Sequence, residues 1–410
     1  MNPADAPHSR RWIWLSGLWV IYAAFGLISG GLAPLVAEIG GELGLSRAAL
    51  GSVMGAWPLV YIASALPAGL AVDRWGVRRA LIWGALCVAA SSGLRALAWD
   101  HLSLFAAVAL FGLGGPLISI GAPKLIGARF PQDERGLALG LYTTGPAVGH
   151  MAALGATQAW VLPWLGGWRQ GLAFYALLAL AAAALWGVVS RDLEASSAPP
   201  PGPGAEERIA VPDLLRTPGV PLCLALGVGC FLYAHGLTGW LPEILRSGGM
   251  TPTRAGWAAA FATGVGVPAA ILIPRLALPP RRAYLLSATF ACGSAAAVLL
   301  LAGVWWPALV LLGLARACLV PILVLALIES PGLRAAQVGA ASGLFFSFAE
   351  AGGVAGPLLL GLLADFSGGF LPPLAAFGGL ALALSALSLA LPRPPRPYAK
   401  LAPRREERSA

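Results

Sequence analysis

Charged side chains are nearly missing from long stretches of this sequence. They make up 11% of its 410 residues, whereas hydrophobic residues make up 58%. None occurs between Arg11 and Glu38, and further uncharged stretches span 48–72, 102–123, 136–168 and 170–190. A bilayer core about 30 Å thick is crossed by roughly 20 apolar residues of helix. The sequence therefore predicts an all-α membrane protein rather than a soluble domain.

Cysteine is also rare, and its five copies have no spacing typical of a metal site or a disulfide framework. All of them lie inside apolar segments: Cys87, Cys223, Cys230, Cys292 and Cys318. We expect them to be small packing residues, and we predict no metal site and no cofactor. The sequence also lacks a nucleotide-binding loop and a nucleophile with its base, so we do not expect an enzyme or an ATP-driven pump.

Twelve apolar segments have the length of a membrane-spanning helix. They are 12–36, 48–71, 80–98, 103–126, 137–161, 170–190, 217–241, 255–275, 283–303, 306–328, 338–362 and 370–391. The first is bounded by Arg10 and Arg11 and is too long for a cleavable signal peptide. We therefore expect it to remain as the first transmembrane helix.

The basic residues are distributed unevenly between the loops. Lys and Arg number 27, and most of them fall before the first segment, in every second loop and after the last segment. Five fall at the opposite ends of the segments: Arg47, Arg95, Arg169, Arg246 and Arg254. Because cytoplasmic loops carry the excess of Lys and Arg, we predict that both termini are cytoplasmic, in a plasma membrane such as a bacterial inner membrane. We expect contact with the lipid bilayer and no nucleic-acid binding.

A polar, proline-rich stretch divides the chain in two. It covers 191–216, and its composition is typical of a linker. The segments on either side of it are similar: Gly31-Leu-Ala-Pro34 corresponds to Gly239-Trp-Leu-Pro242, at an offset of about half the chain. We predict an N-terminal half of six helices at 1–190, a C-terminal half of six at 217–392 and a basic cytoplasmic tail at 393–410.

The loop between the second and third segments carries the most specific motif. It reads Gly69-Leu-Ala-Val-Asp73-Arg74-Trp-Gly76-Val-Arg78, and it resembles the signature loop of the major facilitator superfamily. This resemblance implies twelve helices in two six-helix repeats, with the solute site between the halves near the bilayer midplane. It also implies that Gly69, Asp73, Arg74, Gly76 and Arg78 form a loop that latches the halves together on the cytoplasmic side.

The fifth segment contains Gly140-x-x-x-x-Gly145-Pro146-x-x-Gly149-His150, which resembles a pattern that the superfamily associates with antiporters. The alternative is a proline kink with small residues packed against a neighbouring helix. Short sequence segments such as Ala122-Pro123-Lys124 and Gly167-Trp168-Arg169 resemble segments of transporters in the cyanate and nitroimidazole branch.

Few ionisable residues lie at membrane depth, where each costs at least about 2.5–3.5 kcal/mol and therefore needs a partner or a function. Arg316 and Glu350 form a buried ion pair, or else Arg316 binds an anionic substrate while Glu350 carries the coupling proton. Lys124 lines the cavity or extends to the interface. His150 and His235 are proton relays or packing residues.

The polar neutral residues that we expect in the substrate site are Tyr22, Tyr142, Thr144 and Tyr233, together with Arg316 and Lys124. The resemblance and these charges favour a monomeric secondary transporter. It would move a small anionic solute by alternating access, coupled to protons or to a counter-solute. The alternative functions are a drug or metabolite efflux antiporter of broad specificity and a membrane sensor or scaffold that transports nothing.

Overall fold

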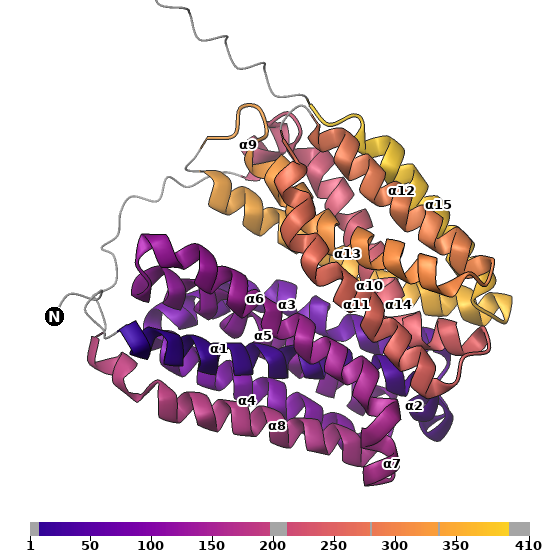
Figure 1. Ribbon diagram of the computed structural model, residues 1–410, viewed down its shortest axis with the longest axis horizontal. Coiled ribbons are helices and arrows are strands. Elements are labelled where there is room, and N and C mark those ends of the chain that lie inside the picture. Colours follow the sequence, from indigo (N-terminus) through magenta and orange to yellow (C-terminus); the bar gives the residue numbers. More distant parts are fainter. Residues whose placement is uncertain (1–7, 197–210, 279–280, 335–336, 393–410) are drawn as a thin grey trace, which may run out of the picture.

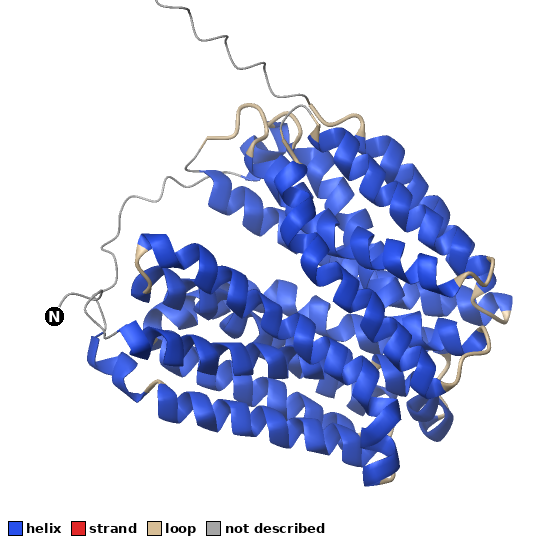
Figure 2. Cartoon of the chain, in the orientation of Figure 1, coloured by secondary structure: helices blue, strands red, loops and turns tan. Residues whose placement is uncertain are grey.

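The computed structural model describes residues 8–196, 211–278, 281–334 and 337–392. The predicted linker at 191–216 is therefore described only in part, and the predicted tail at 393–410 lies outside the described residues. Throughout the described ranges the chain is helix or loop, without a β-strand (Figure 2).

The elements up to residue 196 are α1 (His8–Gly30), η2 (Ala33–Leu35), α2 (Val36–Leu43), α3 (Arg47–Trp75), α4 (Val77–Ala96), α5 (His101–Arg129), α6 (Gln132–Ala156), η3 (Thr157–Val161), α7 (Leu162–Leu165), α8 (Trp168–Val189) and η4 (Arg191–Ser196). After residue 210 they are α9 (Val211–Arg216), α10 (Val220–Ser247), α11 (Pro252–Leu272), η5 (Ile273–Leu276), α12 (Arg282–Leu301), α13 (Trp305–Ile328), α14 (Val338–Ser367) and α15 (Leu371–Ser388).

Eleven of these helices are long and apolar enough to cross a membrane. The one predicted span that is not among the eleven is the fifth, 137–161, which corresponds to the 25-residue helix α6. Its lower hydropathy reflects the charged start at 133–135 and the polar residues Thr143, Thr144 and His150. The predicted all-α membrane fold is confirmed. Six long helices lie in each of two bundles, α1–α8 and α10–α15 (Figure 1).

Inside each bundle, neighbouring helices pack with almost no space between their backbones. A Cβ atom on Gly149 of α6 would lie 1.8 Å from the carbonyl oxygen of Ala23 in α1, and one on Gly352 of α14 would lie 2.0 Å from that of Val228 in α10. Only glycine permits such contact. The glycine motif of the fifth segment therefore has a packing role against α1.

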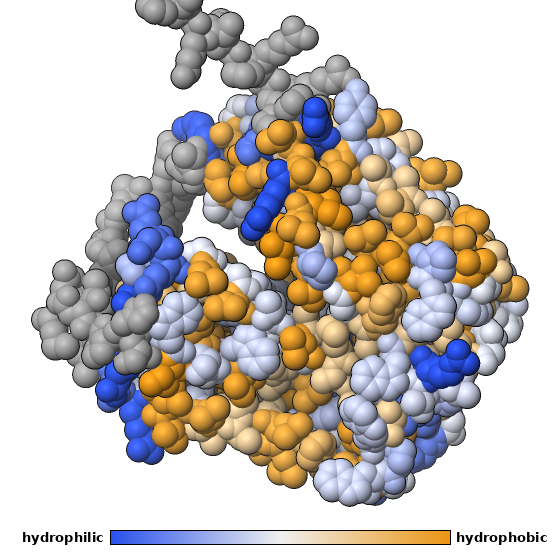
Figure 3. Space-filling model, in the orientation of Figure 1, coloured by the Kyte–Doolittle hydropathy of each residue, from blue (hydrophilic) through white to orange (hydrophobic). Residues whose placement is uncertain are grey.

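Among the described residues, the backbone contacts between the two bundles lie towards one end of the molecule. There α3 and α11 begin: a Cβ on Gly51 would lie 2.4 Å from the Pro357 carbonyl oxygen of α14, and one on Gly256 would lie 2.4 Å from that of Leu154 in α6. We call this the closed end. At the opposite end, where α3 and α11 finish, the bundles diverge around a cleft (Figure 3). We call this the open end.

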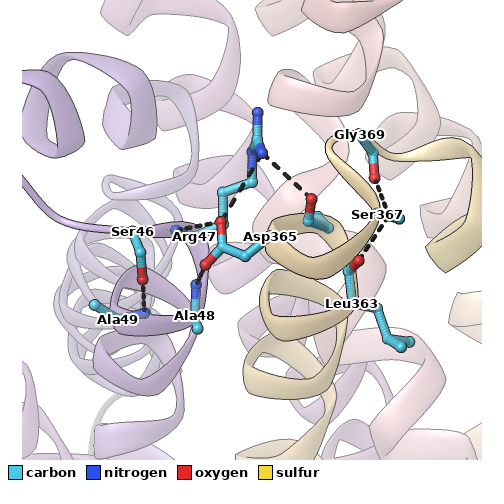
Figure 4. A network of polar contacts seen from close by, with 9 residues as sticks. Ser46, Arg47, Ala48, Ala49, Leu363, Asp365, Ser367 and Gly369 are labelled. Atoms are coloured by element: carbon cyan, nitrogen blue, oxygen red, sulfur yellow. Dashed lines mark hydrogen bonds and ion pairs between the residues drawn. The ribbon is translucent and has the colours of Figure 1, made fainter.

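Polar contacts join the bundles at the closed end. Both carboxylate oxygens of Asp365, near the end of α14, accept backbone N–H bonds from the first turn of α3, at 3.1 Å from Arg47 and 2.7 Å from Ala48 (Figure 4). A second link joins Glu38 of α2 to Arg246 of α10, with 3.3 Å between Oε1 and Nη1. The closed end is therefore held by charged groups as well as by glycine contacts.

Candidate functional site

A cavity of about 530 Å³ lies between the bundles and is lined by residues from both of them. Most of its wall is apolar, including Trp57 of α3 and Phe231 of α10. Its polar and charged lining consists of Ser29, Arg95, Thr143, Thr144, His150, His235, Thr238, Thr263 and Arg316. Among the described lining residues there is no Asp or Glu, so the fixed charge of the wall is positive.

Arg316 is placed in this wall by close packing of α13 on α11. A Cβ atom on Gly313, one turn before it, would lie 2.2 Å from the Ala262 carbonyl oxygen of α11, so the two backbones meet there. The Nε atom of Arg316 is buried and has no hydrogen-bond partner. In the described part of the chain no ion pair joins Arg316 to Glu350, and no acidic group lies within salt-bridge distance of Arg316. The guanidinium therefore faces the cavity without a counter-charge.

Glu350 of α14 is also buried, with 7% of its surface exposed, and it does not line the cavity. Its Oε2 atom has no hydrogen-bond partner. It lies next to His235: a Cβ atom on Gly353 would lie 2.8 Å from Glu350 Oε2 and 2.7 Å from His235 Nδ1. A carboxyl group and an imidazole thus flank the same glycine, and only the imidazole reaches the cavity.

The two predicted histidines both line the cavity. His235 of α10 stacks on Trp57 of α3 with ring centroids 5.6 Å apart, so it joins the two bundles, and Phe231 covers its other side at 5.2 Å. His150 of α6 packs on Gly30, where a Cβ would lie 2.7 Å from its Nδ1, and its Nε2 has no hydrogen-bond partner. Each ring therefore combines packing contacts with access to the cavity.

Of the other predicted substrate-site residues, only Thr144 lines the cavity. Its hydroxyl accepts a bond from Trp19 Nε1 at 2.9 Å. Tyr22 and Tyr142 lie edge to face with each other between helices, and Tyr233 donates a bond to the Gly293 carbonyl at 2.8 Å. These three tyrosines pack between helices and do not line the cavity.

Lys124 lies away from the cavity, where it pairs with Asp73 at the end of α3.

The motif loop is at the open end. Gly76 has a φ of +78° and makes the turn into α4, and Arg78 donates a bond to Ser190 Oγ at 3.2 Å. Arg74 is exposed. A Cβ on Gly69 would be 3.9 Å from its nearest described neighbour, so Gly69 is not a point of close helix packing.

Arg95 is a cavity residue that the sequence analysis placed outside the site, at the end of a span. It is 1% exposed and lies 5.6 Å from the Phe111 ring, measured from Cζ to the centroid. Its Nη1 donates to the Ile28 carbonyl at 3.0 Å, while its Nε has no partner. Ser91 and Ser92, one turn earlier, are also buried. In the sequence, three polar residues within about one helical turn of an apolar segment could have indicated that this face of the helix is part of the site.

With this geometry established, comparison with known proteins identifies the fold family. The model of the Major Facilitator Superfamily matches residues 18–342. The chain belongs to the Major Facilitator Superfamily. It is therefore a multi-pass membrane transporter for a small-molecule solute, and not an enzyme.

Three relatives of this superfamily member have curated names. An uncharacterised transporter, YycB, of Bacillus subtilis is 26% identical and covers 88% of this chain and 89% of its own. The 2-nitroimidazole transporter of Escherichia coli is 28% identical over 60% of this chain and 61% of its own. A D-galactonate transporter of Escherichia coli is 26% identical over 38% of this chain and 36% of its own.

Solved structures share the fold of this superfamily member at low sequence identity. A bacterial homologue of the human lysosomal transporter Spinster, in an inward-facing and occupied conformation, aligns with a TM-score of 0.76 and 16% identity. The alignment covers 95% of this chain and 98% of that one. The family match over residues 18–342 confirms the superfamily that the motif loop and the repeat predicted.

Proposed function

We propose that this transporter carries a small organic anion across the membrane by alternating access, with Arg316 binding the anionic group. The single observation that carries the proposal is the charge of the cavity. Arg316 faces it with a buried, unpartnered Nε, and no acidic residue lies among the described lining residues. A buried cation without a counter-charge is costly, and a bound anion would supply that charge. The apolar wall suits an organic body.

Glu350 is the proposed carrier of a coupling proton. Its carboxyl group is buried, and its Oε2 atom has no hydrogen-bond partner. Such surroundings favour the neutral, protonated form of a carboxyl group. His235 lies next to it and lines the cavity, and it is the proposed relay, with His150 as a second relay on the opposite bundle. In this scheme Arg316 and Glu350 have separate tasks, which their lack of an ion pair supports.

The proposed arrangement in the membrane follows the basic loops. Both termini and the linker at 191–216 would be cytoplasmic, which makes the open end cytoplasmic and this conformation inward-facing. The proposed domain boundaries remain 1–190, 217–392 and 393–410, with the chain acting as a monomer. A bacterial inner membrane is the proposed location, given the bacterial relatives.

Two relatives support different solute classes. The D-galactonate transporter favours an organic acid. The 2-nitroimidazole transporter matches a longer part of this chain and supports the proposed membership of the cyanate and nitroimidazole branch. It also keeps drug or metabolite efflux as a second candidate, which the mostly apolar cavity wall favours.

The test is ligand binding and counterflow with the purified full-length protein, using D-galactonate, short carboxylates and 2-nitroimidazole as probes. Arg316→Ala should abolish binding and counterflow of the carboxylates. Arg254→Ala removes an exposed arginine at the start of α11 and should change neither. Binding of 2-nitroimidazole alone, unaffected by Arg316→Ala, would contradict the anion proposal and favour the efflux function.

A further inference from the structure

Two arginines from opposite bundles line the same cavity. Arg95 comes from α4 and Arg316 from α13, and in each the Nε atom is buried without a hydrogen-bond partner. Among the described residues, the Arg95 guanidinium donates one hydrogen bond, from Nη1 to the Ile28 carbonyl in the last turn of α1. That bond satisfies a backbone carbonyl at the C-terminus of α1 but does not neutralise the positive charge of the Arg95 guanidinium.

The cavity wall carries no compensating acid among its described residues, and the nearest buried carboxyl group, Glu350, lies next to His235. Two unpaired positive charges in the wall of one cavity are unfavourable, and a bound anion of equal total charge would offset both of them. A single carboxylate would neutralise one guanidinium and leave the other unpaired.

We infer that the solute is an organic dicarboxylate held at one end by Arg95 and at the other by Arg316. This inference rests on the proposed function and makes it specific. The volume of about 530 Å³ is within the range of sites for small organic ligands. The apolar surfaces of Trp57 and Phe231 suit the hydrocarbon stem between the two carboxylates. An inorganic dianion would leave those surfaces in contact with water.

The experiment compares acids of equal chain length with one and two carboxylates: butyrate with succinate, valerate with glutarate and hexanoate with adipate. In the wild-type protein we expect the best dicarboxylate to bind at least about 10-fold more tightly than its monocarboxylate, since a hydrogen bond to a charged group has that magnitude. Arg95→Gln should remove this preference while changing monocarboxylate binding less than about threefold. Arg316→Ala should abolish both.

Each failure has its own pattern. Equal wild-type affinity for both members of every pair, with binding still lost in Arg316→Ala, would overturn the dicarboxylate inference and leave the proposed function standing. Absence of wild-type binding to all six acids would overturn both. Because Arg95 is fully buried, Arg95→Lys serves as a second variant: it keeps a charge and should retain part of the preference. An equal loss for mono- and dicarboxylates in both variants would mean that Arg95 is only structural.

A separate observation concerns the closed end. The first N–H groups of a helix have no partner within the helix. In α3, Ser46 Oγ accepts from Ala49 at 3.2 Å, but the N–H groups of Arg47 and Ala48 bond to Asp365 of the other bundle (Figure 4). A Cβ atom on Gly361 would lie 2.3 Å from the Arg47 carbonyl oxygen, so the two helices are in backbone contact at this cap.

The geometry points to Asp365 as a latch that exists only while this end is closed. Alternating access requires α3 and α14 to separate here, and separation would exchange the two bonds to the Asp365 carboxylate for bonds to water. The favourable interaction of an anion with a helix N-terminus would be lost at the same time. Asp365 would therefore bias the resting carrier towards the conformation described here.

Spectroscopic distance measurements test the latch. Gly41 and Gly369 lie at the closed end on opposite bundles and have open space around them, so both accept a labelled cysteine once the native cysteines are replaced. Asp365→Ala should shift the distances towards longer values, and Asp365→Asn, which keeps one acceptor, should shift them less. Asp133→Ala removes an acidic residue from the first turn of α6 and is the control. Unchanged distances in Asp365→Ala would overturn the latch.

Discussion

At the scale of single residues, the surroundings of Glu350 distinguish between two roles that the sequence left open. Glu350 could be the structural ion-pair partner of Arg316, or it could carry the coupling proton. A structural pair with Arg316 would bring their charged atoms within 4 Å, and no such contact occurs among the described residues. Each group is instead buried with an unsatisfied atom. Such atoms are rare in folded proteins and often mark functional sites.

The first prediction concerns Glu350→Gln, which resembles the protonated acid. We expect the variant to bind and exchange the solute but to lose accumulation driven by a proton gradient. The double variant Arg316→Gln with Glu350→Gln should be folded and inactive, because the two groups do not neutralise each other. Counterflow and gradient-driven uptake in the same vesicles make the measurement, and Asp213→Asn on the exposed start of α9 is the control. Normal uptake by the double variant would refute the assigned roles.

At the scale of helices, the glycine contacts divide the molecule into rigid pairs and a movable interface. Within the bundles, α6 packs on α1 and α14 packs on α10 through backbone contacts at Gly149 and Gly352. Both pairs lie inside a bundle, so alternating access does not require their helices to separate. We therefore expect each pair to move as one body.

The second prediction tests this packing. Gly149→Ala would place a methyl group 1.8 Å from the Ala23 carbonyl oxygen, so α1 and α6 must separate. Forcing atoms into a packed contact costs about 1–3 kcal/mol, and we expect a clear fall in the melting temperature. Gly136→Ala, on the exposed start of the same helix with nothing within 4 Å, should be neutral or slightly stabilising. Equal melting temperatures for the two variants would contradict the assignment.

The third prediction concerns the motif loop, where Asp73 pairs with Lys124 at the open end. Asp73→Asn should slow transport and leave the equilibrium affinity for the solute nearly unchanged, because the loop is far from the cavity lining. Lys124→Gln should behave in the same way, since it removes the other half of the pair. Parallel measurement of binding and counterflow separates the two quantities. A similar loss in both would mean that the loop shapes the site or the fold.

The positions of the helices could be predicted from the sequence, and the faces that they turn to the cavity could not. Runs of uncharged residues define the transmembrane helices because the bilayer requires them. Inside a membrane bundle both the lipid side and the protein side of a helix are apolar, so periodicity does not distinguish them. For this reason Tyr22, Tyr142 and Tyr233 were expected in the cavity and are found in helix contacts.

Arg95 shows the same limit from the other direction. Near the end of a span, an arginine is expected to extend to the interface. The chain instead turns it inward, where the carboxyl end of α1 at Ile28 accepts its hydrogen bond. That acceptor comes from a break between α1 and η2 that is distant in sequence, so the neighbouring serines could indicate a buried polar face at Arg95 but not its hydrogen-bond partner.

At the scale of the whole molecule, the proposed orientation in the membrane is open to a direct test, which is the fourth prediction. With the native cysteines replaced, a cysteine at Gly41, at the closed end, should react with a membrane-impermeant maleimide in intact cells. A cysteine at Arg281, in the exposed turn before α12, should react only after permeabilisation. The opposite pattern would place the open end on the outside and reverse the proposed direction of access.

The positive lining of the cavity also has a consequence for kinetics. While the cavity is open, water reaches the partly exposed side chain of Arg316. Closing it without a solute would strip that water away and leave the charge unsatisfied, which is costly in a low-dielectric interior. The unloaded protein should therefore change sides slowly and the loaded one quickly. Flux measured with solute on both sides of the membrane should exceed flux into solute-free vesicles, so the wall that selects the cargo would also prevent the empty carrier from dissipating a gradient.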